Sequence, residues 1–244
     1  MNRHTLLSLS ALCSVLLQAC AAPSTPPTSP ESLAQAATAV LDEAVYYSTL
    51  FSSCASLGGE IEIDAISKQQ DWLNSNNQLL LSADQLYSQQ QAANTFEYQG
   101  KTLAPTAIKL AREAKQRAIK ELSLNQRTPF NQVKTCEFRL SKINASSNNL
   151  AKHPKIAPYA PELLTHLPLD QAIANIPSLA AGITEVAPGP TYYKLVKEHE
   201  SKCPTGFTLS IVNQWPKEAY ANFCGDSSVE VLTCDWGNCE TKKL

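Results

Sequence analysis

The eight cysteines of this 244-residue chain constrain its fold more than any other feature. Cys13 and Cys20 lie in an N-terminal segment, and the other six lie between positions 54 and 239. In an oxidising compartment six cysteines permit fifteen sets of three disulfides, so the sequence alone does not fix their pairing. Whether the six meet such a compartment depends on what the N-terminal segment does.

The first twenty residues have the composition of an export signal. Arg3 supplies a positive start, an apolar run follows from Leu6 to Leu17, and the small residue Ala19 precedes Cys20. The run is short for a membrane span, which takes about 20 apolar residues. The end of the segment, Leu17-Gln18-Ala19-Cys20, resembles the lipobox of bacterial lipoproteins, although Gln18 stands where a small or β-branched residue is usual.

The resemblance implies a lipid anchor. Residues 1–19 would form a signal peptide cut before Cys20, which would carry a diacylglyceryl thioether and, in Gram-negative bacteria, an amide-linked chain such as palmitate. Several acyl chains hold a protein on a membrane effectively permanently, whereas one chain does so marginally. Ala21, in place of aspartate, implies the periplasmic face of the outer membrane. The alternative is an ordinary secretory signal, cleaved elsewhere, in which Cys20 occurs by chance.

Export leaves six cysteines for disulfides. The four residues between Cys234 and Cys239 read as a hairpin loop, and only two of the six lie in the N-terminal part of the chain. No C-x-x-C motif is present, so the sequence predicts disulfides and no metal site. The spacing favours the pairs Cys54–Cys136, Cys203–Cys224 and Cys234–Cys239.

Four stretches with apolar residues at helical spacing predict an antiparallel helical bundle over residues 31–150. Ser29 and Pro30 have the residue types of an N-cap and a first helical position, and Gly58-Gly59 is a stop signal. Residues 20–30, with four prolines, predict an extended tether of about 30 Å before the bundle. The later helices are expected from after Asp64 to about Gln91, over 105–122 and from Thr128-Pro129 onward.

The C-terminal third of the chain changes character. Residues 151–190 contain seven prolines and predict a connection with short helices, such as one over 169–176. Residues 191–244 alternate in period two and predict a small disulfide-strapped antiparallel β module. Within it, Thr191–Ser201 fits either a helix or a strand. The predicted fold class is therefore α+β.

Charge is unevenly distributed along the bundle. Residues 31–97 hold nine carboxylates and one lysine, whereas residues 98–157 hold twelve basic residues and three glutamates. Helices within 105–143 could present a basic face to anionic lipid or glycan. Alternatively, the acidic and basic helices pack together and neutralise one another, which is the interpretation we favour. The candidate anion contacts are Lys109, Arg112, Arg127 and Arg139.

No catalytic motif is evident. The three histidines of the mature chain, His153, His166 and His199, lack a known catalytic or metal-binding spacing. Glu198-His199-Glu200 would point in different directions on a helix or a strand, so we expect surface or packing roles for it. The sequence predicts no catalytic residues and no cofactor.

The tryptophans differ in their expected environments. We expect Trp72 in the helical core and Trp215, before Pro216, over the sheet. Trp236 lies at the tip of the predicted hairpin loop, where it could anchor a partner or fold back over the adjacent disulfide.

These observations predict a non-enzymatic outer-membrane lipoprotein that binds another envelope protein, as an adaptor, assembly factor or inhibitor. One alternative is a lipid- or glycan-binding protein that uses the basic helices over 105–143. Another is a periplasmic hydrolase whose residues come together from distant positions. The export signal and the slightly acidic composition make nucleic acid an unsuitable partner.

Overall fold

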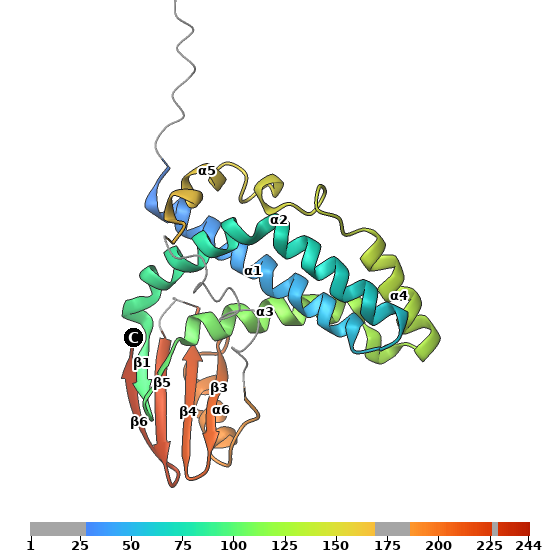
Figure 1. The fold of residues 1–244 in the computed structure, drawn as a ribbon. Helices are drawn as coiled ribbons and strands as arrows, with labels where there is room; N and C mark the ends of the chain where they lie inside the picture. Colours follow the sequence, from blue (N-terminus) through green and yellow to red (C-terminus); the bar gives the residue numbers. More distant parts are fainter. Residues whose placement is uncertain (1–27, 169–185, 226–228) are drawn as a thin grey trace, which may run out of the picture.

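The computed structural model describes residues 28–168, 186–225 and 229–244. A helical part is followed by a four-stranded antiparallel sheet (Figure 1), which confirms the predicted α+β class. Cys20, the predicted tether up to residue 27 and the predicted helix over 169–176 lie outside the described residues. None of the helices in the described ranges combines the length and apolar character that a membrane crossing requires.

Three long helices form the body of the bundle: α1 (Pro30–Ala55), α2 (Glu60–Gln91) and α3 (Pro105–Leu122). The Ser29 side chain caps α1 by accepting a hydrogen bond from the Ser32 N–H at 3.1 Å. Gly58 and Gly59 both have positive φ, so the chain reverses at once and α2 begins at Glu60, four residues before Asp64.

Small residues line the buried parts of α1 and α3. Several alanines of these helices are almost wholly buried in the bundle core, and α4 (Pro129–Ser141) closes the far end of the bundle. A disulfide between Cys54 and Cys136 joins α1 to α4, with 5.5 Å between the two Cα atoms. The buried alanines are Ala36, Ala37 and Ala44 of α1 and Ala107, Ala111 and Ala114 of α3.

The bundle core continues past residue 150. Leu150, Ile156 and Leu163, the last of these in the short helix α5 (Ala160–Leu163), are buried with the long helices. The Asn76 amide of α2 fixes the start of this segment, because its Oδ1 accepts from the Leu150 N–H at 2.7 Å. The proline-rich segment therefore begins as part of the bundle.

Ion pairs join the acidic α1 to the basic α3, and α3 to α4. Arg117 of α3 pairs with Asp42 and Glu43 of α1, the latter at 2.9 Å. Glu121 accepts a hydrogen bond from the Tyr46 hydroxyl at 2.6 Å and pairs with Arg139 of α4 at 2.7 Å. These contacts are of the kind expected if the uneven charges neutralise one another within the bundle.

A small hairpin between α2 and α3 was not predicted from the sequence. Its strands, β1 (Phe96–Tyr98) and β2 (Lys101–Leu103), are joined by Gln99-Gly100, and both of these residues have positive φ. Positive φ at both central positions is the requirement of a type I′ turn.

The C-terminal sheet is a meander of β3 (Phe207–Gln214), β4 (Lys217–Phe223), β5 (Val229–Asp235) and β6 (Asn238–Lys243). The segment that fits either a helix or a strand is a helix, α6 (Tyr192–Lys202). Disulfides join Cys203 to Cys224 and Cys234 to Cys239. Together with Cys54–Cys136, these are the pairs that the cysteine spacing favours.

One face of this sheet is apolar, and the other also buries polar residues such as Thr208, Ser210 and Glu218. Alternate residues of β4, such as Ala221 and Phe223, pack on Phe96 of the hairpin and Ile108 of α3. On the opposite face of the sheet, Tyr220 of β4 and Leu232 of β5 pack on Leu195 of α6. The sheet therefore joins the bundle on one face and is covered by its own helix on the other (Figure 1).

The disulfides should differ in what they contribute to stability. In the chain-entropy model the constraint on the unfolded chain grows with loop size, and the pairs at positions 54/136 and 234/239 are separated by 82 and 5 residues. We expect Cys54→Ala/Cys136→Ala to lower the free energy of unfolding by about 4–5 kcal/mol and Cys234→Ala/Cys239→Ala by about 2 kcal/mol. Urea unfolding of the two variants measures both values, and the reverse order would contradict the prediction.

Candidate functional site: an interaction surface at the end of the sheet

Two hairpin turns lie side by side at the end of the sheet that is farther from the bundle (Figure 1). Trp215-Pro216 joins β3 to β4 and contains a cis peptide bond. Trp236-Gly237 joins β5 to β6, and both of its residues have positive φ, as a type I′ turn requires. Each turn thus carries a tryptophan, although turn tips are usually polar.

The two tryptophans form one exposed aromatic surface. Trp215 is 51% and Trp236 69% exposed, and their ring centroids are 5.7 Å apart at an interplanar angle of 75°. This edge-to-face arrangement is a favourable one for aromatic pairs. We call the pair the tryptophan surface.

Contacts between the two turns fix the tryptophan surface in place. The Trp236 N–H donates to the Pro216 carbonyl oxygen at 3.0 Å. Beside this hydrogen bond, Lys217 of β4 pairs with Asp235 of β5 at 2.8 Å. The two tips are therefore held to each other through the backbone as well as through the rings.

A buried polar cluster lies next to the tryptophan surface. The wholly buried Glu218 accepts hydrogen bonds through Oε2 from the Tyr220 hydroxyl at 3.0 Å and from the Thr191 N–H at 3.3 Å. The hydroxyl of Tyr98, from the β1–β2 hairpin, lies 3.3 Å from the carbonyl oxygens of Glu218 and Cys234. These bonds connect the start of α6 and the hairpin to the strands that carry the turns.

The structure departs from the sequence interpretation at one tryptophan. Trp215 does not cover the sheet but lies half exposed at a turn, because the strand ends at Gln214 and the next begins at Lys217. Trp236 packs edge-on against Trp215 and is mostly exposed. Trp72 is in the helical core, only 2% exposed.

The four candidate anion contacts are dispersed. Lys109 and Arg112 lie in the first half of α3 against the Phe207 ring of β3, at 5.9 and 5.3 Å from its centroid. Arg127 and Arg139 follow beyond the other end of α3. The four therefore do not gather at one place on the helices.

All four cations have contacts within the chain. Lys109 pairs with Glu113 at 3.0 Å, and Arg139 pairs with Glu121. The Arg127 Nε–H donates to the Leu122 carbonyl oxygen at 3.1 Å. An anionic ligand would compete with these contacts for the same cations.

The three histidines lie apart from one another. His153 borders a cavity of about 670 Å³ that also contains Glu43 and Arg117, and its Nδ1 accepts from the Lys155 N–H at 3.3 Å. His166 ends a short 3₁₀ segment after α5, and His199 is buried in α6. In the described ranges of the chain, no imidazole is hydrogen-bonded to a serine hydroxyl or to a carboxylate.

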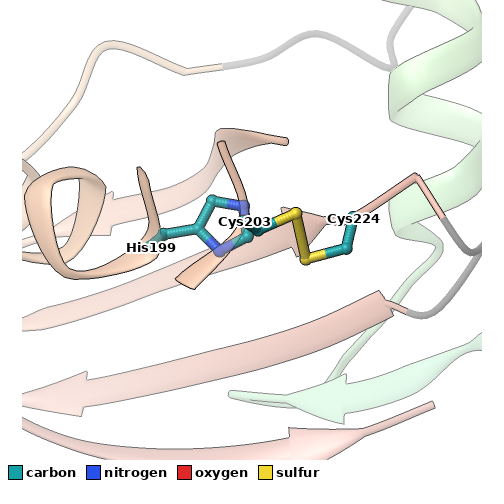
Figure 2. A group of neighbouring side chains, drawn as sticks. All are labelled: His199, Cys203 and Cys224. Atoms are coloured by element: carbon teal, nitrogen blue, oxygen red, sulfur yellow. A yellow bond between two sulfur atoms is a disulfide. The ribbon is translucent and has the colours of Figure 1, made fainter. Parts of the chain in front are cut away.

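One group of neighbouring histidine and cysteine side chains was not predicted from the sequence. His199 and Cys203 are four residues apart at the end of α6, and the fold places Cys224 beside them (Figure 2). The i,i+4 spacing was a local signal, because such residues share a helix face. The third member could not be found locally, since it comes from the end of β4.

No family model, curated protein or solved structure matches this chain.

The phenol of Tyr220 makes stability sensitive to alkaline pH. Burial raises its pKa to about 12, with a further contribution from the bond to Glu218. An unfolded tyrosine ionises near pH 10, so between about pH 10 and 12 only the unfolded chain loses this proton and stability falls. Urea unfolding at stepwise higher pH should show this fall, reduced by about 2 kcal/mol in Tyr220→Phe. Equal slopes for the two proteins would contradict the prediction.

Proposed function

We propose that this chain is a protein-binding lipoprotein of the bacterial outer membrane, and that the tryptophan surface is its contact site. The observation that carries the proposal is the exposed, edge-to-face pair of Trp215 and Trp236 at adjacent turns. The N-terminal resemblance to a lipobox supplies the expected anchor at Cys20.

Tryptophans of this kind are typical of protein interfaces. A few aromatic residues commonly supply most of an interface's binding energy, and such residues are often surrounded by polar contacts that exclude water. Lys217 and Asp235 provide a polar rim of this type beside the two rings. The backbone contact between the turns also reduces the entropy that the rings would lose on binding.

The position of the surface suits a protein held at its N-terminus. In Figure 1, helix α1 begins at the top of the view, on the side of the bundle opposite the sheet, whereas the two turns lie at the bottom. With Cys20 in the membrane and a tether before α1, the tryptophan surface would face away from the membrane. A soluble or membrane-attached envelope protein could then reach it.

The contacts of the basic residues weigh against the lipid- or glycan-binding alternative. Its candidate cations are dispersed along α3 and beyond, and Lys109, Arg127 and Arg139 already have partners within the chain. An exposed pair of aromatic rings favours a protein partner over a polyanion.

Site-specific crosslinking in cells tests the contact site. A photo-crosslinking residue at position 214, which is exposed beside Trp215, should yield one adduct of defined mass with another envelope protein. Trp236→Ala should abolish this adduct, and with the purified partner it should weaken binding by about 30-fold, the loss expected for a central aromatic anchor.

Phe130 of α4 is the matched control, because it is 70% exposed, close to the value for Trp236. Phe130→Ala should leave the adduct intact. A Cys20→Ser chain should incorporate no labelled palmitate, whereas the wild type should, which tests the anchor separately. Equal adducts from the wild type and Trp236→Ala would overturn the assignment of the contact site.

A further inference from the structure

Three side chains of the C-terminal module have their ligating atoms close together (Figure 2). Nitrogen of His199 and the sulfurs of Cys203 and Cys224 all lie within 4.8 Å of one another. His199 and Cys203 are placed by the end of α6, where the Cys203 N–H donates to the His199 carbonyl oxygen at 2.8 Å. Cys224 directly follows β4, and its sulfur is joined to that of Cys203.

The imidazole of His199 has an unused nitrogen. The residue is only 5% exposed, and its Nε2 has no hydrogen-bond partner. A buried polar atom left in this way is costly, by about 1–3 kcal/mol, and such atoms are rare in folded proteins. Coordination to a metal ion would use the lone pair of this nitrogen.

Gly206 keeps open the space beside these atoms. A Cβ at this position would lie 2.6 Å from His199 Nε2 and 2.7 Å from Cys203 Sγ. It would also lie 2.5 Å from the Phe223 carbonyl oxygen, so a side chain cannot be added without displacing its surroundings. Position 206 is therefore occupied by glycine, the only residue type without a Cβ, next to His199 Nε2 and Cys203 Sγ.

Solvent reaches the group from one side. A cavity of about 380 Å³ between α3 and the sheet has Cys224 in its wall, with Lys109 and Phe207 among its other lining residues. Cys224 is partly exposed, whereas Cys203 is buried. A reductant and a metal ion could both enter by this route, and an entry path is one requirement of a metal site.

We propose that His199, Cys203 and Cys224 form a Zn²⁺ site when the disulfide between the two cysteines is reduced. An external dithiol would donate two electrons and two protons, so that its own sulfurs form a disulfide as the Cys203–Cys224 bond breaks. Zn²⁺ would then displace the two thiol protons and bind two thiolates and the imidazole. This donor set is one that Zn²⁺ prefers, with a fourth position left for water or another ligand.

The other two disulfides provide a contrast within the same chain. In the described ranges, neither Cys54–Cys136 nor Cys234–Cys239 has a histidine or carboxylate placed to complete a three-ligand group. Reduction alone would give each of them two thiols and no nitrogen ligand. The inference does not depend on the tryptophan surface.

Cobalt titration of the full chain tests the site. The protein is reduced with a phosphine, which leaves no competing thiol, and Co²⁺ is added while circular dichroism follows the fold. We expect one Co²⁺ per chain, a thiolate-to-cobalt charge-transfer band and displacement of the band by Zn²⁺. The oxidised chain should show no band.

Variants distinguish this site from binding by exposed thiols in general. His199→Gln should weaken Co²⁺ binding at least about tenfold, and Cys203→Ser/Cys224→Ser should abolish the band. The controls Cys234→Ser/Cys239→Ser and His153→Gln should bind as the wild type does. Absence of binding by the reduced wild type, folded or not, overturns the proposal, as does equal affinity in His199→Gln.

Discussion

Both faces of the C-terminal sheet are covered, one being apolar and the other mixed in character, and the rest of the structure depends on how both are kept from water. One face packs on α6 through Leu195, within the C-terminal module. The other packs on Phe96 and Ile108, which come from the middle of the helical part. Burial of apolar surface at this junction favours folding by about 25 cal/mol per Å², so the sheet gains stability from segments a hundred residues earlier in the chain.

This junction also determines what the molecule presents to its surroundings. Because β1–β2 and the start of α3 hold one end of the sheet, the turns with Trp215 and Trp236 point away from the helices (Figure 1). The Tyr98 hydroxyl extends the contact along β4 and β5 towards these turns. In the bundle, basic side chains such as Arg117 form ion pairs with acidic ones such as Glu43. The pair of tryptophan rings at the two turns is an exposed apolar feature.

Local signals in the sequence predicted the elements that local energetics determines. Proline at position 105 and the alanine spacing gave the bounds of α3, and the four-residue gap after Cys234 indicated the last hairpin. The β1–β2 hairpin was not predicted, because its strands have only three residues each and are stabilised by contacts with the distant sheet. The tyrosine-rich start of α6 suits a strand by propensity, and packing on the sheet decides for a helix. Likewise, the environment of His199 follows from contacts between segments that are apart in the chain.

Native-state hydrogen exchange of the wild-type chain tests most directly whether the junction makes one cooperative unit of bundle and sheet. If it does, the slowest amides of β4 and of α1 open with the same free energy and the same dependence on denaturant, because both require global unfolding. Amides of β4 that exchange through a separate opening, of lower free energy and smaller denaturant dependence, would contradict the account.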